Sequence, residues 1–478
     1  MRRAYDERGA HPPARDADAD AARRDADAAR RVTARHDVIA MHAATRRDVI
    51  ERIEQLACTF VRDALAATNA SDMPPKVVGL RGVARRRETR FDRARGGWVV
   101  DTRVASRRRR RIDADGEDEG CMDDDVADVE TRGGDVADDD AGREAATSVA
   151  ARFHFSRDGG AAYHRFWSTL DVIRQGLRRE CSMTMRELYY VMLSRGRGDH
   201  GERLTDGKLT DTIRQISAAI GAPRNALGLS AASKGQVCGR VHVETAFGSR
   251  HDCTMVGSGG FAITGDMCEM DAMTLYSDAA YVVVVEKDAV FQRLLNERIF
   301  DVIPCVVITA KGFPDFATRK FLFLLERALE RNPIQSRFYM LADFNPSGLW
   351  IWSSYSSGSG ASLMDSVPYA VPLELIGLCA DDLRLVPENA FQPLTSRDES
   401  LIENALAAGE RAPLFAHRRE LETMRARGQK AEIEALYAND DSFSLSAFIA
   451  AKIAEDEARR REKRATRDAA RRQFLNTA

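Results

Sequence analysis

The sequence predicts an α/β protein with more than one domain, and two patterns carry that prediction. Three helical segments followed by a β-rich stretch occupy the middle of the chain, and after about residue 270 apolar β-branched runs alternate with helices. A length of 478 residues with 44% apolar residues is enough for two cores plus poorly folded extensions.

The N-terminal third is mostly low in complexity. Residues 1–43 are rich in Ala, Arg and Asp, so we expect a disordered extension. Residues 44–100 hold a connecting segment and a predicted amphipathic helix over about 46–67, whose apolar residues are Val49, Ile53, Leu56, Phe60, Val61 and Leu65. Residues 101–147 are typical of an exposed insertion, and their arginines 107–111 fit a nuclear-import signal or a solvated loop equally well.

Residues 148–250 are predicted to form a winged-helix domain. The first helix carries a stripe of Phe166, Leu170, Ile173 and Leu177, the second begins at the capping box "TMRE", and the third, "KLTDTIRQISAAIG", ends at Gly221. The β-rich "KGQVCGRVHVE" follows them. Three helices and then strands is the order of a winged-helix module, which commonly docks a helix on DNA.

Residues 270–440 are predicted to form a parallel sheet flanked by helices. The strands lie in "AAYVVVVEKD", "IPCVVITAKGFPD" and "SRFYMLADFNPSG", and the helix "ATRKFLFLLERALERN" separates the last two. Ligands gather at the carboxyl ends of such strands. Residues 441–478 have the composition of a charged helix or tail, which fits a solvated helix better than a contact with DNA or a partner.

The stretch "MTMRELYYV" places two tyrosines on one helix. Met185, Leu188, Tyr189 and Met192 share one face, whereas Tyr190 lies over Arg186 on another. Phenol has a pKa of about 10, and a nearby guanidinium favours phenolate and steadies charge on a phosphoryl transition state. The alternative is a surface tyrosine with a cation–π neighbour.

Acidic and amide side chains follow the predicted strands. Glu286 closes one strand and Asp343 another, and Asn345 supplies a further oxygen. Such oxygens suit Mg²⁺, although Asp and Asn also favour turns and caps regardless of metal. Lys311 follows a third strand, where it is either a functional cation or a solvated turn lysine.

Composition narrows the class of protein. No apolar run approaches the roughly 20 residues of a membrane span, and the N-terminus lacks a signal-peptide core, so we expect an intracellular protein without a membrane partner. Eight scattered cysteines have no zinc-ligand spacing. Residues 113–140 hold fourteen acids against Arg132, so the remainder carries a net charge of +11 and weakly favours a polyanionic partner.

Several motifs in order resemble one family, which comprises the DNA-breaking A subunit of topoisomerase VI and its eukaryotic relative, the meiotic double-strand-break transesterase. The resemblance covers about 147–437, and the matching stretches are "MRELYY", "SKGQVCG", "VVVVEKDAVFQRL", "ITAKGFPDFATR", "ADFNPSGLWI" and "RRELETMRARGQKAEIEAL". It implies that the parallel-sheet domain is a Toprim domain.

The resemblance assigns roles to residues of this sequence. It implies that Tyr190 is the nucleophile and Arg186 the catalytic arginine, and that Glu286 and Asp343 hold Mg²⁺. The family's D-x-D is here Asp343-Phe344-Asn345, so we expect weaker binding of a second ion. The resemblance also implies DNA contacts for Lys234, Lys311 and Phe313.

The implied activity is that of a type IIB topoisomerase-like transesterase in the nucleus. Tyr190 would attack a phosphate of double-stranded DNA and leave a 5′-phosphotyrosyl link, within a homodimer that works with accessory proteins and a separate ATPase-like B subunit. The low-complexity segments and the altered D-x-D favour a meiotic break-former that initiates recombination. The alternatives are a resealing A subunit of topoisomerase VI, a Toprim nuclease that uses water, and an inactive DNA-binding scaffold.

Overall fold

The computed structural model describes residues 40–62, the strand segments 77–82, 89–92, 97–100 and 148–154, and residues 159–477 with gaps at 196–203, 231–232, 246–247, 258, 333–334, 359–368, 410–412 and 439–441. The predictions for residues 1–39, for the insertion at 101–147 and for Leu65 lie outside the described residues.

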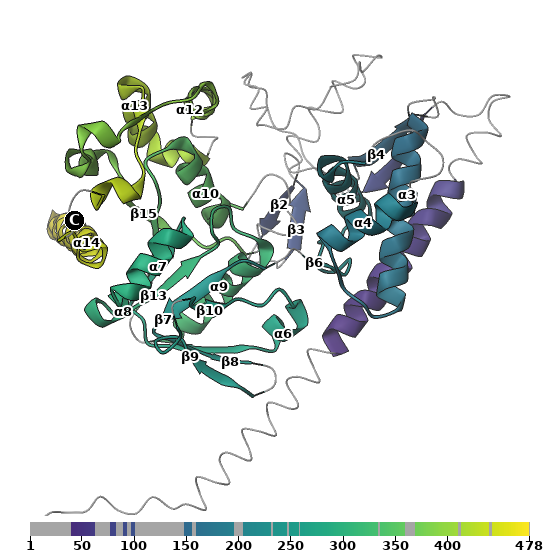
Figure 1. Ribbon diagram of the computed structural model, residues 1–478, viewed down its shortest axis with the longest axis horizontal. Helices are drawn as coiled ribbons and strands as arrows, with labels where there is room; N and C mark the ends of the chain where they lie inside the picture. Colours follow the sequence, from purple (N-terminus) through teal and green to yellow (C-terminus); the bar gives the residue numbers. More distant parts are fainter. Residues whose placement is uncertain are drawn as a thin grey trace, which may run out of the picture.

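A helical unit carries the tyrosine pair (Figure 1). α3 (Gly159–Arg178), α4 (Met185–Arg195) and α5 (Asp206–Ile220) share one core with the first helix, residues 40–62. The stripe predicted for α3 is confirmed, because all four of its apolar residues are buried. Gly221 ends α5 as predicted, with a left-handed φ of 70° that suits glycine.

One residue of the first helix departs from its predicted stripe. Val61 is 56% exposed, whereas Val49, Ile53 and Phe60 are buried. Neighbouring residues of a helix point about 100° apart, and in the first helix Phe60 points to the core whereas Val61 points to solvent.

Short strand pairs accompany these helices. β1 (Val77–Gly82) pairs antiparallel with β4 (Ser148–His154), which lies against α3 and α5. There are two further short pairs: β2 (Thr89–Asp92) with β3 (Gly97–Val100), antiparallel, and β5 (Met183–Thr184) with β6 (Leu229–Ser230), parallel.

A six-stranded sheet forms the second unit. Its order is β10 (Phe261–Ala262), β7 (Gln236–Gly239), β13 (Cys305–Thr309), β12 (Tyr281–Val285), β14 (Arg337–Leu341) and β15 (Glu374–Gly377). The last four strands are parallel, which confirms the predicted parallel sheet, and β7 and β10 add antiparallel pairs at one side.

Helices bury both faces of this sheet (Figure 1). Val283 and Val285 of β12 join the core formed with α7 (Asp288–Asn296) and α8 (Ile299–Val302), whereas Val282 and Val284 join the core formed with α9 (Phe316–Leu329). Because successive strand residues point to opposite faces, a continuous valine run is what a doubly covered strand requires.

The strands over residues 236–244 do not belong to the winged-helix module that the order of helices and strands predicts. We predict them as part of the winged-helix domain, but β7 pairs with β13 in the large sheet, and β8 (Val241–Glu244) forms a separate sheet with β9 (Arg250–Asp252) and β11 (Thr274–Ser277). Val237 and Cys238 are buried in the two opposite cores of the large sheet, which offers more burial than a half-exposed wing.

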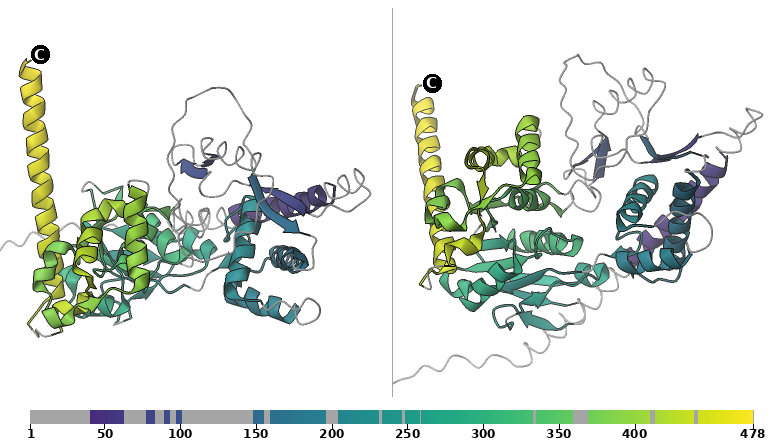
Figure 2. Two further views of the ribbon diagram at one scale, coloured as in Figure 1. Left: turned by 90° about the horizontal axis from the view of Figure 1, so that it is seen from above. Right: turned by 45° about the horizontal axis from the view of Figure 1, so that its top comes forward.

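The remaining elements complete the second unit. They are α6 (Met267–Asp271), α10 (Pro346–Ser356), η3 (Ala380–Leu385), η4 (Glu388–Ala390), β16 (Gln392–Pro393), α12 (Ser396–Ala408), η6 (Pro413–His417), α13 (Arg418–Arg427), β17 (Gln429–Lys430), η7 (Ile433–Leu436) and α14 (Leu445–Thr477). α14 extends well beyond the rest of the unit (Figure 2). Among the described residues, no helix has both the length and the apolar character that crossing a bilayer requires.

The partly exposed carboxylate of Asp271 links the two units. Asp271 of α6 lies 2.9 Å from His42 Nε2 on the first helix and 2.5 Å from Lys320 Nζ on α9. Lys320 is buried, so its charge depends on that carboxylate for compensation. Asp271 therefore bonds both to α9 of its own unit and to the first helix of the helical unit.

We predict that His417 makes the fold sensitive to acid. Its ring packs edge-on against Trp352 of α10 with centroids 4.3 Å apart, and burial lowers the pKa of His417 to about 4. Between pH 6.5 and 4 the unfolded chain binds more protons at this position than the folded chain, so stability falls as the pH falls, by about 2 kcal/mol at pH 4.5. His417→Phe should flatten this part of the pH profile of the unfolding free energy, measured by urea titration. Equal slopes in the two proteins would contradict the prediction.

Candidate active site at the carboxyl edge of the sheet

The two predicted acids lie beside each other. β12 and β14 run parallel with Val285 opposite Leu341, so Glu286 and Asp343 both emerge at the carboxyl edge. The backbone amide of Asp343 donates to Glu286 Oε2 at 3.1 Å. Glu286 is 8% exposed and Asp343 only 4%, so both carboxylates are largely removed from water.

Burial controls the protonation of this pair. Burial, and after it the neighbouring Asp343 carboxylate, raise the pKa of Glu286 to about 7. Burial also raises the pKa of Asp343, against the opposing effect of the Lys287 ammonium. Two close carboxylates out of water favour a proton or a cation between them.

Lys287 is a component of the site that our sequence reasoning missed. Its Nζ lies 2.9 Å from Asp343 Oδ2, 2.7 Å from Glu434 Oε2 and 3.3 Å from Glu432 Oε2. Burial lowers the pKa of Lys287, but the Asp343 and Glu434 carboxylates outweigh it and hold that pKa above its ordinary value. Lys287 therefore stays charged and neutralises part of the acidic cluster.

The segment that supplies Glu432 and Glu434 is far away in sequence. Phe344 and Ala431 form a two-way backbone bridge, and the amide of Ile433 donates to Asp343 Oδ1 at 3.0 Å. The stretch "GQKAEIEAL" contains these residues, but no local pattern shows that it adds a strand-like contact beside Asp343. The sequence feature that could have indicated this charge cluster is Lys287 directly after Glu286, together with Glu432 and Glu434 in the later stretch.

Asn345 serves as the N-cap of α10. Its Oδ1 accepts a hydrogen bond from the amide of Gly348 at 2.7 Å, which is the capping alternative that its sequence position left open. A Cβ on Gly348 would lie 2.7 Å from the Asp343 carbonyl oxygen and 3.2 Å from Glu286 Oε2. Only glycine lets the start of α10 approach the two acids this closely, and a helix N-terminus favours negative charge.

The three predicted DNA-contacting residues lie at the same edge. Lys311 has a φ of 55°, the following amide of Gly312 donates to the Glu286 carbonyl oxygen at 2.8 Å, and Lys311 Nζ lies 3.3 Å from Asp288 Oδ2. Phe313 is 53% exposed. The amide of Lys234 donates to Asp315, the N-cap of α9, so its loop meets the same turn.

The tyrosine helix has the geometry that its spacing predicts. Leu188 and Met192 are buried, and the hydroxyl of Tyr189 donates to the Leu204 carbonyl oxygen at 3.4 Å. Tyr190 is 55% exposed, and Arg186 is exposed as well. The first half of the capping box is present, because the amide of Glu187 donates to Thr184 Oγ1. One tyrosine packs and the other is presented to solvent.

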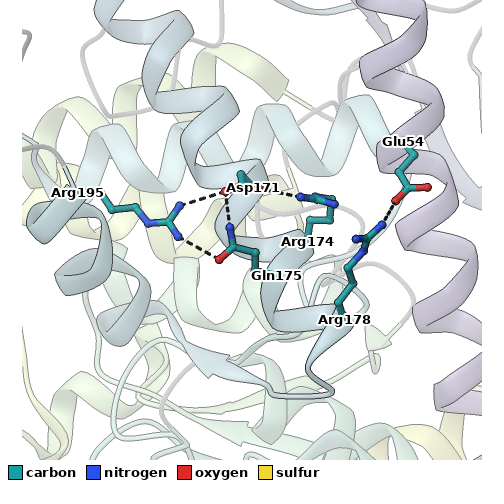
Figure 3. Close-up of polar contacts among 6 residues, drawn as sticks. All are labelled: Glu54, Asp171, Arg174, Gln175, Arg178 and Arg195. Atoms are coloured by element: carbon teal, nitrogen blue, oxygen red, sulfur yellow. Dashed lines mark hydrogen bonds and ion pairs between the residues drawn. The ribbon is translucent and has the colours of Figure 1, made fainter.

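Polar contacts pin α4 to its neighbours (Figure 3). Arg195, at the end of α4, bonds Asp171 Oδ2 at 3.3 Å and Gln175 Oε1 at 3.2 Å on α3. Arg178 of α3 in turn pairs with Glu54 of the first helix at 2.5 Å. At the other end, Met183 and Thr184 directly precede α4 and pair with β6, so both ends of the tyrosine helix are held.

The donor set is compatible with magnesium. Among the described residues, no group of three or more His, Cys, Asp or Glu side chains is arranged to hold a metal ion. Mg²⁺ does not need such a cage, because it is usually held by one or two carboxylates, with water and substrate phosphate completing its shell. Glu286 and Asp343 provide that number of carboxylates.

The site falls into two parts within one chain. In the described structure, no side-chain hydrogen bond or ion pair joins Tyr190 or Arg186 to Glu286 or Asp343. The acids and the exposed lysines share the sheet edge, whereas the tyrosine lies on the helical unit.

Comparison with known proteins identifies the family of this chain. The family model for the Toprim domain of the topoisomerase 6 A subunit and Spo11 matches residues 281–453. The rice (japonica) protein named meiotic recombination protein SPO11-2 is 36% identical over 295 residues, which cover 62% of this chain and 74% of that protein. The chain belongs to the Spo11/topoisomerase 6 A family.

Other members of the Spo11/topoisomerase 6 A family are also similar. The A subunit of Arabidopsis DNA topoisomerase 6 is 31% identical, covering 60% of this chain and 65% of that protein. The human meiotic recombination protein SPO11 is 32% identical, covering 56% and 65%. The resemblance seen in the motifs is confirmed, and the sheet with its acidic edge is the family's Toprim domain.

We predict that Asn345 stabilises the fold as a cap. Asn345→Ala should lower the free energy of unfolding by about 1 kcal/mol, because the Gly348 amide loses its partner. Asn345→Asp is the matched control, since Asp caps a helix as well as Asn does. Urea unfolding of the three proteins without metal tests this, and an alanine variant as stable as the native protein would contradict it.

Proposed function

We propose that this protein is a type IIB topoisomerase-like transesterase that makes double-strand breaks in DNA and remains linked to the 5′ ends through Tyr190. The observation that carries the proposal is the presentation of Tyr190 beside Arg186 on a pinned helix, in a chain of this family that also holds the paired Toprim acids. Its relatives named for meiotic recombination support a role in initiating that process in the nucleus.

The chemistry assigned to Tyr190 is an exchange of phosphodiester bonds. Its phenolic oxygen forms a bond to phosphorus while the bond from phosphorus to the 3′ oxygen breaks. The phenol gives up its proton and the departing 3′ oxygen gains one, so no water is consumed. Arg186 favours the phenolate and steadies charge on the phosphoryl group. Lys234, Lys311 and Phe313 are proposed to contact the DNA.

Glu286 and Asp343 are the proposed ligands of Mg²⁺. When bound, the ion would supply positive charge to a phosphate oxygen and so favour displacement. Asn345 is proposed as a weaker ligand, because its Oδ1 already accepts the Gly348 amide. Lys287 offsets the remaining negative charge of Asp343, Glu432 and Glu434.

The proposed working form is a homodimer. Because Tyr190 and the acids make no contact within the described part of one chain, we propose that each active site joins the tyrosine of one protomer to the acids of the other. The helical unit is then the DNA-docking winged-helix domain, with its strands drawn from β1 to β6 rather than from β7 and β8. Accessory proteins and a separate ATPase-like B subunit are proposed partners.

A second candidate is a resealing A subunit of topoisomerase VI. The similarity to the Arabidopsis protein of that kind favours it. The two functions differ in whether plasmid DNA is relaxed and resealed when an ATPase partner is present, which is the assay that separates them.

We predict that Tyr190→Phe abolishes covalent attachment to DNA. The protein is recovered under denaturing conditions and its 5′-linked DNA is measured; the native protein should carry DNA and the variant none. Tyr189→Phe is the matched control and should retain attachment, because its hydroxyl bonds the Leu204 carbonyl oxygen instead of facing solvent. Attachment that survives Tyr190→Phe would reject this nucleophile, and breaks without attachment in the native protein would indicate a nuclease.

We predict that Mg²⁺ binding depends on the acid pair. Calorimetric titration with Mg²⁺ alone should show affinity reduced by about tenfold or more in Glu286→Gln and increased in Asn345→Asp, which restores the second acid. Because burial raises the pKa of Glu286 to about 7, affinity should rise as the pH rises through 7. Unchanged affinity in Glu286→Gln would place the metal elsewhere.

A further inference from the structure

The proximal part of α14 is anchored to the Toprim domain. Leu445, Ile449 and Ile453 are buried in its core, and the Glu297 carboxylate accepts the amide of Ser446 at 2.7 Å. The hydroxyl of Tyr339 donates to Asp456 at 3.1 Å. Arg460 also pairs with Glu374 of β15, so the helix is fixed by packing and polar contacts up to that residue.

The next stretch, residues 459–467, has a different character, and we name it the basic stretch. It contains six cations and one acid: Arg459, Arg460, Arg461, Lys463, Arg464 and Arg467, with Glu462. Residues 461–467 are all exposed, and the helix projects away from the domain here (Figure 2). Within the described part of the chain, Lys463, Arg464 and Arg467 have no acidic partner.

The charges of the basic stretch work against the isolated helix. The charges of Arg459, Arg460 and Arg461 are offset by ion pairs with Asp456, Glu374 and Glu457. Lys463 and Arg467, however, are like charges four residues apart, which repel on a helix surface. The helix dipole does not account for them, because it acts within the last turn and α14 continues to Thr477. Such a pattern is relieved by a partner of opposite charge.

We propose that the basic stretch binds the phosphate backbone of duplex DNA, an inference that rests on the proposed function of the site. The stretch has no large apolar side chain, so it lacks the anchors with which a helix binds a protein groove. Phosphate contacts need only cations on a rigid support. At about 1.5 Å per residue, cations four apart recur about every 6 Å along a straight rod.

This contact lies away from the chemical step. The family match ends at residue 453, before the basic stretch begins, and neither Tyr190 nor the acid pair contacts it in the described structure. Its contribution is therefore to affinity, without base readout. Binding should be equally strong on duplexes of different sequence and should weaken steeply with salt.

The test removes Lys463, Arg464 and Arg467, the cations of the basic stretch that have no acidic partner among the described side chains. Lys463→Ala, Arg464→Ala and Arg467→Ala are combined in the full-length protein, because alanine preserves helix propensity. Fluorescence anisotropy with a labelled duplex of about 30 base pairs is measured over a salt series. The slope of log affinity against log salt should become shallower by about 3, since about 0.9 counterion is released per phosphate contact. Helix content by circular dichroism is compared alongside.

A matched control removes the same number of positive charges from a different part of the domain. Arg384→Ala, Arg425→Ala and Arg427→Ala remove three exposed cations elsewhere on the same domain, and this variant should keep the native slope. An unchanged slope in the α14 variant would overturn the proposal. So would an equal change in both variants, or tighter DNA binding by the α14 variant.

Covalent attachment separates this inference from the proposed function. The α14 variant at saturating DNA should form the Tyr190 link as the native protein does. If the α14 variant keeps the native slope of log affinity against log salt and still attaches to DNA, the proposal for the basic stretch is rejected and the proposed transesterase function stands. A shallower slope with no attachment by the native protein would support the basic stretch and reject the transesterase, whereas a native protein that binds no duplex would overturn both.

Discussion

The structure of the Toprim domain depends on placing two carboxylates side by side out of water. Glu286 and Asp343 repel each other, and burial removes the solvent that would screen them. The surrounding elements compensate: Lys287 brings a positive charge, the amides of Asp343 and Ile433 donate to the carboxylates, and the start of α10 points toward them. Gly348 is required because any side chain there would meet the acids.

This compensation links segments far apart in sequence. Asp343 accepts the Ile433 amide, and Lys287 bridges Asp343 to Glu434, so the acid site cannot form until the chain returns beside β14 some ninety residues later. Acidic residues and their counter-charge are thus assembled by tertiary structure. The family match over residues 281–453 spans both contributions, which suits a domain whose site needs its two ends together.

Local periodicity was sufficient wherever one element determined the outcome. It placed Tyr190 outside and Tyr189 inside on α4, and the valine run of β12 in a doubly covered sheet. It did not identify the partner of β7, because a strand pattern does not show which strand it joins. For the same reason, local periodicity did not show that Lys287 and Glu434 meet at the site. It also did not decide whether Asn345 is a helix cap or a metal ligand, since both roles use the same oxygen.

The separation of Tyr190 from the acids has a mechanistic consequence under the proposed function. A nucleophile kept apart from the charges that promote its reaction is inert until something joins the two parts. Arg195 holds one end of the tyrosine helix and the β5–β6 pairing holds the other, and the contact of His42 with Asp271 links the helical unit to its own Toprim domain. Rotating the unit toward its own acids would break the hydrogen bond between His42 and Asp271 that links the two units. Meeting the acids of a second chain leaves it intact, so dimerisation is the less costly route to a complete active site, and it couples the cutting of one strand to the presence of the protomer that cuts the other.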